Sequence, residues 1–282
     1  MIKIGIRAHD MGRYSLEDFL ELLKIIKNKD GECVQLALGK SFFDLKVTKE
    51  NLNNDLAFHL KSNLDSKNIK LSVLGCYINM GNPNGDVRDQ EIEKFKYHLD
   101  FSKNFPGCVV GSETGCLTTD YTFTPLNNTE KAFNVFLNSL ERMVKYAEKT
   151  ETLVAIEGVK KDIISTPEKM DLALKSIPSE NLKVIFDPVN FLDITNYNNQ
   201  KIIIEKSFEL FANKIVIVHL KDFKVENGIF KVVPIGQGIF DIDTLMSCIK
   251  KYNLNVDILL ENSTIETAKQ CIQFTMDSYK NN

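Results

Sequence analysis

Eight short runs of apolar, β-favouring residues recur along the chain, separated by stretches with helical periodicity. Most of these runs are nearly continuous in apolar residues, which is typical of strands buried on both faces of a parallel sheet. They are IKIGI (2–6), CVQLAL (33–38), KLSVLGC (70–76), GCVVGS (107–112), LVAIEG (153–158), KVIFDP (183–188), KIVIVHL (214–220) and DILLEN (257–262). Eight such strands alternating with helices predict an α/β fold, a closed (β/α)₈ TIM barrel.

Several of the intervening stretches carry helix start signals. Ser15, with Asp18 three residues later, resembles a capping box before an apolar stripe. Thr129 precedes another stripe, and Thr166 precedes Pro167, a favoured residue in the first helical turn. Further helices are expected near 88–104, 200–212, 241–252 and 266–279.

The order of the elements favours one continuous unit. No break in composition or long linker divides the chain, so we expect residues 1–282 to form a single domain. A doubly wound open sheet is the alternative, but the first strand–helix junction, GIRAHDMGR, lacks a GxGxxG loop. Asn227-Gly228, within 223–240, predicts a small hairpin inserted after strand seven.

Composition excludes several classes of protein. The 35 basic and 38 acidic residues give a net charge of −3, whereas a dedicated nucleic-acid binder normally has a basic excess. No apolar run approaches the roughly 18 residues of a membrane span, and no secretory leader precedes MIKIGIR. The six cysteines form no CxxC pair, so we expect them to be reduced. These features favour a cytoplasmic protein without nucleic-acid or membrane partners.

Four polar residues stand at the carboxyl ends of the last four predicted strands. They are Glu157, Asp187, His219 and Glu261. Each is one strand–helix unit from the next, and the carboxyl ends of barrel strands surround one mouth, where active sites lie. The four side chains should therefore converge, although any one of them alone could be an ordinary polar group at the rim.

Such a set of side chains suits a divalent cation. Three carboxylates in one water-poor mouth would repel each other and raise their pKa values, and a cation removes that repulsion. Oxygen ligands with one imidazole favour Mn²⁺, Mg²⁺ or Co²⁺, and Zn²⁺ is compatible with the same set. We expect one divalent metal ion, with Mn²⁺ or Mg²⁺ the best candidates.

The motifs around these residues resemble a known family. VAIEGV (154–159), VIFDPVN (184–190), VIVHLKD (216–222), PIGQG (234–238) and ILLEN (258–262) are similar to motifs of the xylose isomerase-like TIM barrel superfamily. This superfamily includes sugar-phosphate isomerases and epimerases, ketose 3-epimerases and inosose dehydratases. The resemblance covers essentially the whole chain, and its most specific element is HxKD followed by GxG.

The resemblance implies a site and a reaction. Glu157, Asp187, His219 and Glu261 would bind one divalent metal. Glu157 and Glu261 would also be the catalytic residues, one removing a proton next to a carbonyl and the other returning it to the opposite face. The metal would stabilise the intervening enediolate. The expected activity is that of a metal-dependent sugar or sugar-phosphate isomerase or epimerase, with a small-molecule substrate.

The sequence departs from this family at three positions near the mouth. Asn190 replaces a histidine that many members carry three residues after the strand-six aspartate, and asparagine cannot carry a proton. Val225 replaces an arginine common in ketose 3-epimerases, and VKKDIIS (159–165) lacks a histidine common after the strand-five glutamate. The metal ligands are retained while the substrate contacts differ, so no particular sugar is assigned.

Four further residues are candidate substrate contacts: His9, Glu113, Asn190 and Lys221. His9 and Glu113 follow strands one and four, and Asn190 can still bind a hydroxyl. Lys221 either contacts a substrate carboxylate or phosphate or forms an ion pair with its neighbour Asp222. We expect Gln35, within strand two, to be structural.

Other functions remain open on this sequence. A lyase similar to inosose dehydratase would use the same metal but expel a β-hydroxyl, and a non-catalytic sugar-binding barrel needs no acid–base pair. A DNA-repair nuclease of the endonuclease IV type is disfavoured because it needs three zinc ions and many histidines, and this chain has four histidines. Pairing with a second copy of the chain is compatible with the fold.

Overall fold

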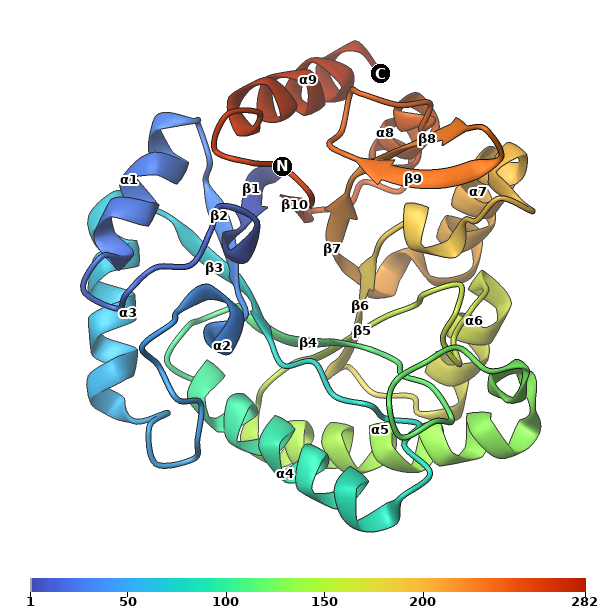
Figure 1. The fold of residues 1–282 in the computed structure, drawn as a ribbon, viewed down its shortest axis with the longest axis horizontal. Coiled ribbons are helices and arrows are strands. Elements are labelled where there is room, and N and C mark those ends of the chain that lie inside the picture. The colour runs from blue at the N-terminus through green and yellow to red at the C-terminus, as the bar shows by residue number, and fades with distance from the viewer. Residues whose placement is uncertain (1) are drawn as a thin grey trace.

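The computed structural model describes residues 2–282 and contains a closed barrel of eight parallel strands surrounded by helices (Figure 1). Around the barrel the strands follow the order β1-β10-β7-β6-β5-β4-β3-β2. Their bounds are β1 Lys3–Arg7, β2 Cys33–Leu36, β3 Lys70–Gly75, β4 Val109–Glu113, β5 Val154–Glu157, β6 Leu182–Phe186, β7 Ile215–Leu220 and β10 Asp257–Leu260. The predicted TIM barrel is confirmed.

The principal helices form the outer ring. They are α1 Phe19–Asn28, α3 Asn54–Lys67, α4 Gly85–Ser102, α5 Glu130–Thr150, α6 Pro167–Ser176, α7 Gln200–Phe211, α8 Ile242–Lys251 and α9 Ala268–Asn281, and α2, Leu38–Ser41, is a single turn. The hydroxyls of Thr129 and Thr166 accept hydrogen bonds from backbone N–H groups in the first turns of α5 and α6, as their positions predicted. Among residues 2–282, no helix is both long and apolar enough to cross a membrane.

Two expectations about helices were wrong. Ser15 does not cap α1, which begins four residues later at Phe19; the Ser15 hydroxyl instead accepts a hydrogen bond from the Asp18 N–H. The helix α3 was not predicted, because its buried face consists mainly of a thin leucine stripe with four-residue spacing within an otherwise polar segment. Packing against the barrel stabilises this helix more than its local pattern indicates.

A two-stranded antiparallel hairpin, β8 (Asp222–Glu226) and β9 (Ile229–Val233), follows β7 and lies at the rim of the barrel (Figure 1). Its two-residue turn is Asn227-Gly228, and both residues have positive φ, as the hairpin turn predicted from the sequence requires. The Asp222 carboxylate accepts backbone hydrogen bonds from Phe223, Gly236, Gly238 and Phe240 at 2.8–3.1 Å. Asp222 therefore anchors the base of the hairpin.

The barrel interior contains an apolar layer to which most strands contribute one residue. Its members are Cys33, Val73, Val109, Ala155, Ile185, Ile217 and Leu259. On β1 the corresponding position is Gly5, where a Cβ atom would lie 1.8 Å from the Cys33 carbonyl oxygen, so only glycine fits. All six cysteines are buried and free, as expected.

Candidate metal centre and active site

The candidate site lies one layer above this apolar floor. Because side chains alternate along a strand, the next inward positions follow two residues later. Those positions are Gln35, Gly75, Gly111, Glu157, Asp187, His219 and Glu261. The two-residue period thus places the four predicted ligands in a single layer at the carboxyl ends of the strands.

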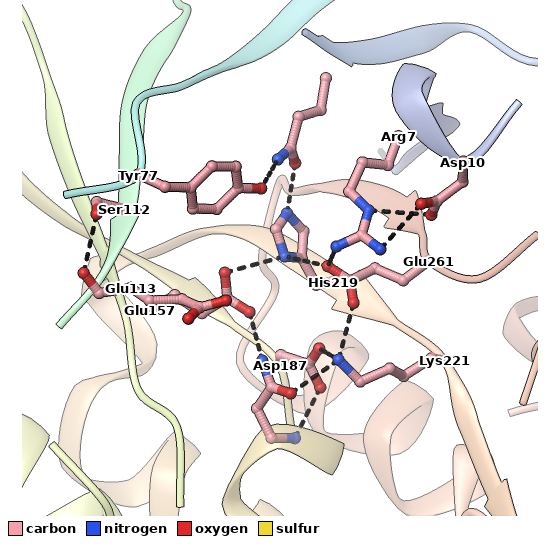
Figure 2. A network of polar contacts seen from close by, with 12 residues as sticks. Arg7, Asp10, Tyr77, Ser112, Glu113, Glu157, Asp187, His219, Lys221 and Glu261 are labelled. Carbon is pink, nitrogen blue, oxygen red and sulfur yellow. Dashed lines mark hydrogen bonds and ion pairs between the residues drawn. The ribbon is translucent and has the colours of Figure 1, made fainter. Parts of the chain in front are cut away.

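The four predicted ligands come together. Glu157, Asp187, His219 and Glu261 each offer one ligand atom, and these atoms lie within 4.8 Å of one another. All four residues are buried, with exposed fractions of 1–4%. Figure 2 shows the side chains converging from β5, β7 and the residues just after β6 and β10. A buried cluster of three carboxylates and one imidazole can hold a divalent cation.

Hydrogen bonds orient the imidazole of His219. Gln35 Nε2 donates to the Tyr77 hydroxyl at 2.8 Å, so Gln35 Oε1 faces His219 Nε2 at 2.7 Å and accepts its hydrogen. His219 Nδ1 then faces Glu157 Oε2 at 3.2 Å and Glu261 Oε1 at 3.1 Å. An acceptor holding the second ring nitrogen is typical of metal-binding histidines.

Two buried atoms of the cluster also fit a metal. His219 Nδ1 and Asp187 Oδ2 are shielded from solvent, and among the described residues their contacts with Glu157, Glu261 and Lys221, at 2.7–3.2 Å, are ion pairs without good hydrogen-bond geometry. Buried polar atoms are nearly always satisfied, so such atoms need an explanation. Coordination of a cation would satisfy both. The donor set and its unsatisfied atoms therefore fit the divalent ion expected from the sequence.

The electrostatics of the cluster are those of crowded carboxylates. Burial, opposed by Lys221, raises the pKa of Asp187 to about 6, with Glu261 and Glu157 adding to the rise. Burial lowers the pKa of His219, but the carboxylates of Glu157 and Glu261 outweigh it and raise the value to about 10. Without a metal, the cluster therefore retains a proton on the imidazole.

Lys221 lies inside the cluster rather than beside it. Its Nζ is 2.7 Å from Asp187 Oδ2 and donates to Glu261 Oε2 and Asn190 Oδ1, each at 2.8 Å. The alternative expectation, an ion pair between Lys221 and Asp222, is therefore wrong. The Asp222 carboxylate instead accepts backbone hydrogen bonds from Gly236 and Gly238 at the base of the hairpin. Lys221 fixes the orientation of two candidate ligands.

Arg7, which the sequence analysis missed, also contacts a candidate ligand. Its Nη1 lies 2.6 Å from Glu261 Oε1, and its other nitrogens bind Asp10 (Figure 2). Burial raises the pKa of Glu261, but Lys221, His219 and Arg7 outweigh it and hold that pKa well below the usual range. The predicted strand ended at residue 6, whereas β1 ends at Arg7. Arg7 lies two residues after the inward position Gly5, so the two-residue period of the strand would have placed its side chain in the mouth.

The remaining predicted contacts also lie around the mouth. Asn190 Nδ2 donates to Glu157 Oε1 at 2.7 Å, so asparagine occupies the position between the cluster and the rim. Glu113 is the register neighbour of Glu157 and receives a hydrogen bond from Tyr121 at 3.2 Å. His9 lies in a short 3₁₀ turn after β1, and its Nδ1 is buried without a partner among the described residues.

Burial shifts the pKa values of the Glu113 carboxyl group and the His9 imidazole in opposite directions. Burial, assisted by Asp162, raises the pKa of Glu113. Burial, assisted by the positive charges of Arg7 and Lys40, lowers the pKa of His9 to about 3. The His9 imidazole is therefore neutral at pH 7, and a neutral imidazole can exchange hydrogen bonds with a polyhydroxylated ligand without the cost of burying a charge.

Comparisons with known proteins agree with the fold. The family model for the xylose isomerase-like TIM barrel matches residues 23–275. A search of curated proteins finds no match.

Among solved structures, a D-tagatose 3-epimerase-like protein is 17% identical, with a TM-score of 0.77 over 99% of this chain and 97% of that one. A xylose isomerase-like TIM barrel protein from Mycobacterium smegmatis, in complex with magnesium, is 10% identical, with a TM-score of 0.73 over 99% and 96%. The IOLI protein with a bound zinc atom is 17% identical, with a TM-score of 0.74 over 99% and 98%. At these identities the likeness establishes the fold.

Proposed function

The chain belongs to the xylose isomerase-like TIM barrel family, and on this basis we propose that it is a divalent-metal-dependent isomerase or epimerase of a sugar or sugar phosphate. The observation that carries the proposal is the buried cluster of Glu157, Asp187, His219 and Glu261. Three carboxylates and one imidazole form a ligand set that a divalent cation takes, and in the metal-free protein Lys221, Arg7 and the protonated His219 balance the buried carboxylates.

The four cluster residues would hold the metal, and Mn²⁺ or Mg²⁺ suits an oxygen-rich set best. When bound, a divalent ion supplies Lewis-acid stabilisation of the negative charge that develops on a sugar carbonyl oxygen when a neighbouring C–H bond is broken. Asp187 and His219 act as holding ligands. Gln35 keeps His219 Nδ1 directed at the cluster, because it accepts the hydrogen of the opposite ring nitrogen.

Glu157 and Glu261 exchange protons with the substrate. Glu157 ends β5 and Glu261 directly follows β10, and these strands are separated around the barrel by β6 and β7, so the two carboxyl groups approach the cluster from different directions. Lys221 and Arg7 keep Glu261 ionised, as a carboxylate that accepts a proton must be. Glu157 would carry a proton before the reaction and donate it to the opposite face of the carbon, while the abstracted proton stays on Glu261; both groups then exchange with solvent. Asn190 Nδ2 holds Glu157 Oε1. His9, Glu113, Asn190 and Lys221 supply hydrogen bonds to the substrate hydroxyls.

Proton exchange with solvent tests this proposal directly. The metal-loaded protein is incubated in D₂O with a panel of ketoses, ketose phosphates and inososes, and proton NMR follows the carbon-bound hydrogens. We expect stereospecific loss of one signal for the true substrate. If an ultraviolet-absorbing enone forms instead, the enzyme is a dehydratase-like lyase and the isomerase assignment is wrong.

Two variants test the acid–base pair. Glu157→Gln and Glu261→Gln keep the side-chain shape but cannot exchange a proton, and each should reduce exchange by about 10²–10⁴-fold. Glu209→Gln, at an exposed position on α7, is the matched control and should exchange at the normal rate. Normal exchange in either cluster variant would refute the assignment of that residue.

A further inference from the structure

A second hollow adjoins the candidate site on one side. A cavity of about 590 Å³ lies between the segments that follow β5 and β6, the segment that follows β4, and β9 of the hairpin. Cavities of roughly 300–1,000 Å³ accommodate ligands much larger than one sugar ring. The cavity is therefore larger than a monosaccharide at the cluster requires.

Asn190 connects the cavity to the candidate metal centre. Its side chain contacts Glu157 and Lys221, and the same residue lines the cavity. The backbone carbonyl of Asn190 accepts a 2.7 Å hydrogen bond from the backbone N–H of Lys160, another residue that lines the cavity. A substrate whose reacting carbons lie at the cluster would thus extend past Asn190 into this cavity.

One wall of the cavity is apolar and exposed. Phe123 and Val232, which line it, have exposed fractions of 58% and 44%. Phe230, on the same strand as Val232, is stacked on buried Phe223, with ring centroids 4.6 Å apart. Flat apolar surfaces of this kind pack against the C–H face of a sugar ring or another planar group.

Another part of the lining is positively charged. Lys160 and Lys161 line it, and neither side chain forms an ion pair within the described part of the chain. The nearby Lys169 ammonium is held only by neutral oxygens, those of Asn128, Ile163 and Ser165, at 2.8–3.3 Å. Lys169 does not itself line the cavity, so the lining residues comprise two cations and one carboxylate, with Asp162 and Glu113 also within electrostatic range of Lys161.

The carboxylate that lines the cavity belongs to Asp193. It already accepts hydrogen bonds from the backbone and the hydroxyl of Thr195. The lining residues consequently retain a net positive charge, which favours an anionic ligand.

We propose that this cavity binds the second unit of a two-unit substrate, a ring with an apolar face and an acidic substituent, while the reacting sugar lies at the cluster. This inference rests on the proposed function for its orientation and adds the substrate class, an acidic glycoside. A carboxylate and a phosphate share the recognition chemistry, because lysine ammonium groups bind either as a point charge.

Calorimetry on the full chain loaded with Mg²⁺ tests the proposal without requiring turnover. The probes are glucose, glucuronic acid, cellobiose, cellobiouronic acid and cellobiose 6′-phosphate. We expect each acidic disaccharide to bind at least about tenfold more tightly than neutral cellobiose, because a charge-assisted hydrogen bond contributes about 1.5–3 kcal/mol. Tighter binding of the uronate or of the phosphate identifies the acidic group.

Variants locate the binding. Lys160→Gln and Lys161→Gln should each weaken binding of the acidic disaccharides by about 3–10-fold and leave cellobiose unchanged. Val232→Asp should weaken the same ligands by repulsion, whereas Val232→Thr should not. Lys149→Gln removes the same charge from an exposed position on α5 and is the control expected to have no effect.

Two results would overturn the inference. One is equal affinity for the acidic disaccharides and for glucuronic acid, because the second unit would then contribute nothing. The other is equal binding by the lysine variants and the Lys149→Gln control. Absence of proton exchange with every sugar would instead refute the proposed reaction, since calorimetric binding in the cavity is independent of it.

Discussion

His98 on α4 and His219 on β7 are both almost inaccessible to solvent, with exposed fractions of 2% and 1%. Burial, with the positive charge of Lys94 adding to it, lowers the pKa of His98 to about 4, although its Nδ1 lies 2.7 Å from the Lys94 carbonyl oxygen. The pKa of His219 instead rises to about 10, because Glu157 and Glu261 outweigh its burial. The environment of His98 favours a neutral imidazole, whereas that of His219 surrounds a protonated imidazole with carboxylates.

The contrast indicates which buried polar groups are structural. His98 is buried on α4, and the positive charge of Lys94 near it also disfavours its protonation. The cluster around His219 contains three carboxylates, and two of its buried atoms, His219 Nδ1 and Asp187 Oδ2, have ionic neighbours but no hydrogen bond of good geometry within residues 2–282. Such an arrangement persists in a stable protein because another requirement, here the proposed binding of a cation, maintains it.

The largest effect is expected from removing one charge of the cluster. Asp187→Asn should reduce Mn²⁺ affinity by more than the roughly 10–100-fold typical of losing an outer-shell partner. Asp257→Asn is the matched control, because Asp257 is buried at the opposite end of the barrel with Lys70 and Ser72. Calorimetric titration with Mn²⁺ measures both variants, and an Asp187→Asn protein that binds normally would contradict the assignment of the cluster as a metal site.

The proton on His219 should make metal binding strongly pH-dependent. Since the pKa of His219 in the metal-free protein is about 10, a metal that binds Nδ1 must displace a proton throughout the range from pH 7 to about 10. Mg²⁺ affinity should therefore rise by about tenfold per pH unit over that range. Titrations in two buffers of different ionisation heat count the released protons, and zero release at pH 7.5 would show that His219 is not a ligand.

The pKa of His98 is shifted in the opposite direction to that of His219, and its effect is on the stability of the fold. Its pKa is about 4 in the folded protein and about 6.5 when unfolded, so the unfolded state binds the proton more tightly. Stability is complete above pH 6.5 and falls as the pH drops toward 4, by about 3 kcal/mol in total. His98→Gln should remove this part of the slope in urea unfolding measured across that range, and an unchanged slope would assign it to other groups.

The smallest effect concerns the residues that orient His219. Gln35→Leu removes the acceptor for Nε2 and should lower Mn²⁺ affinity by about 10–100-fold while the protein remains folded. Tyr77→Phe removes only the hydroxyl bound to Gln35 and should have a weaker effect. Equal affinities of wild type and Gln35→Leu would mean that packing alone holds the imidazole in place.

The sequence by itself determined the barrel and the four clustered residues. Long apolar runs can be satisfied only in strands buried on both faces, and residues that end such strands meet at one mouth. The alternation of side chains then brings Glu157, Asp187, His219 and Glu261 into one layer, so strand positions alone were sufficient. The sequence of α3 carries a weaker signal than the strands do, because its apolar face is a thin leucine stripe. The stability of this helix therefore depends on the surface against which it packs.

Only the tertiary structure decided what surrounds those four residues. Arg7 is separated from Glu261 by 254 residues and Gln35 from His219 by 184, so no local pattern records either contact. The same holds for the cavity, whose walls come from four separate segments of the chain. Side-chain contacts and net charge in a barrel mouth depend on which strand ends become neighbours in space. Closure of the sheet determines which strand ends are neighbours.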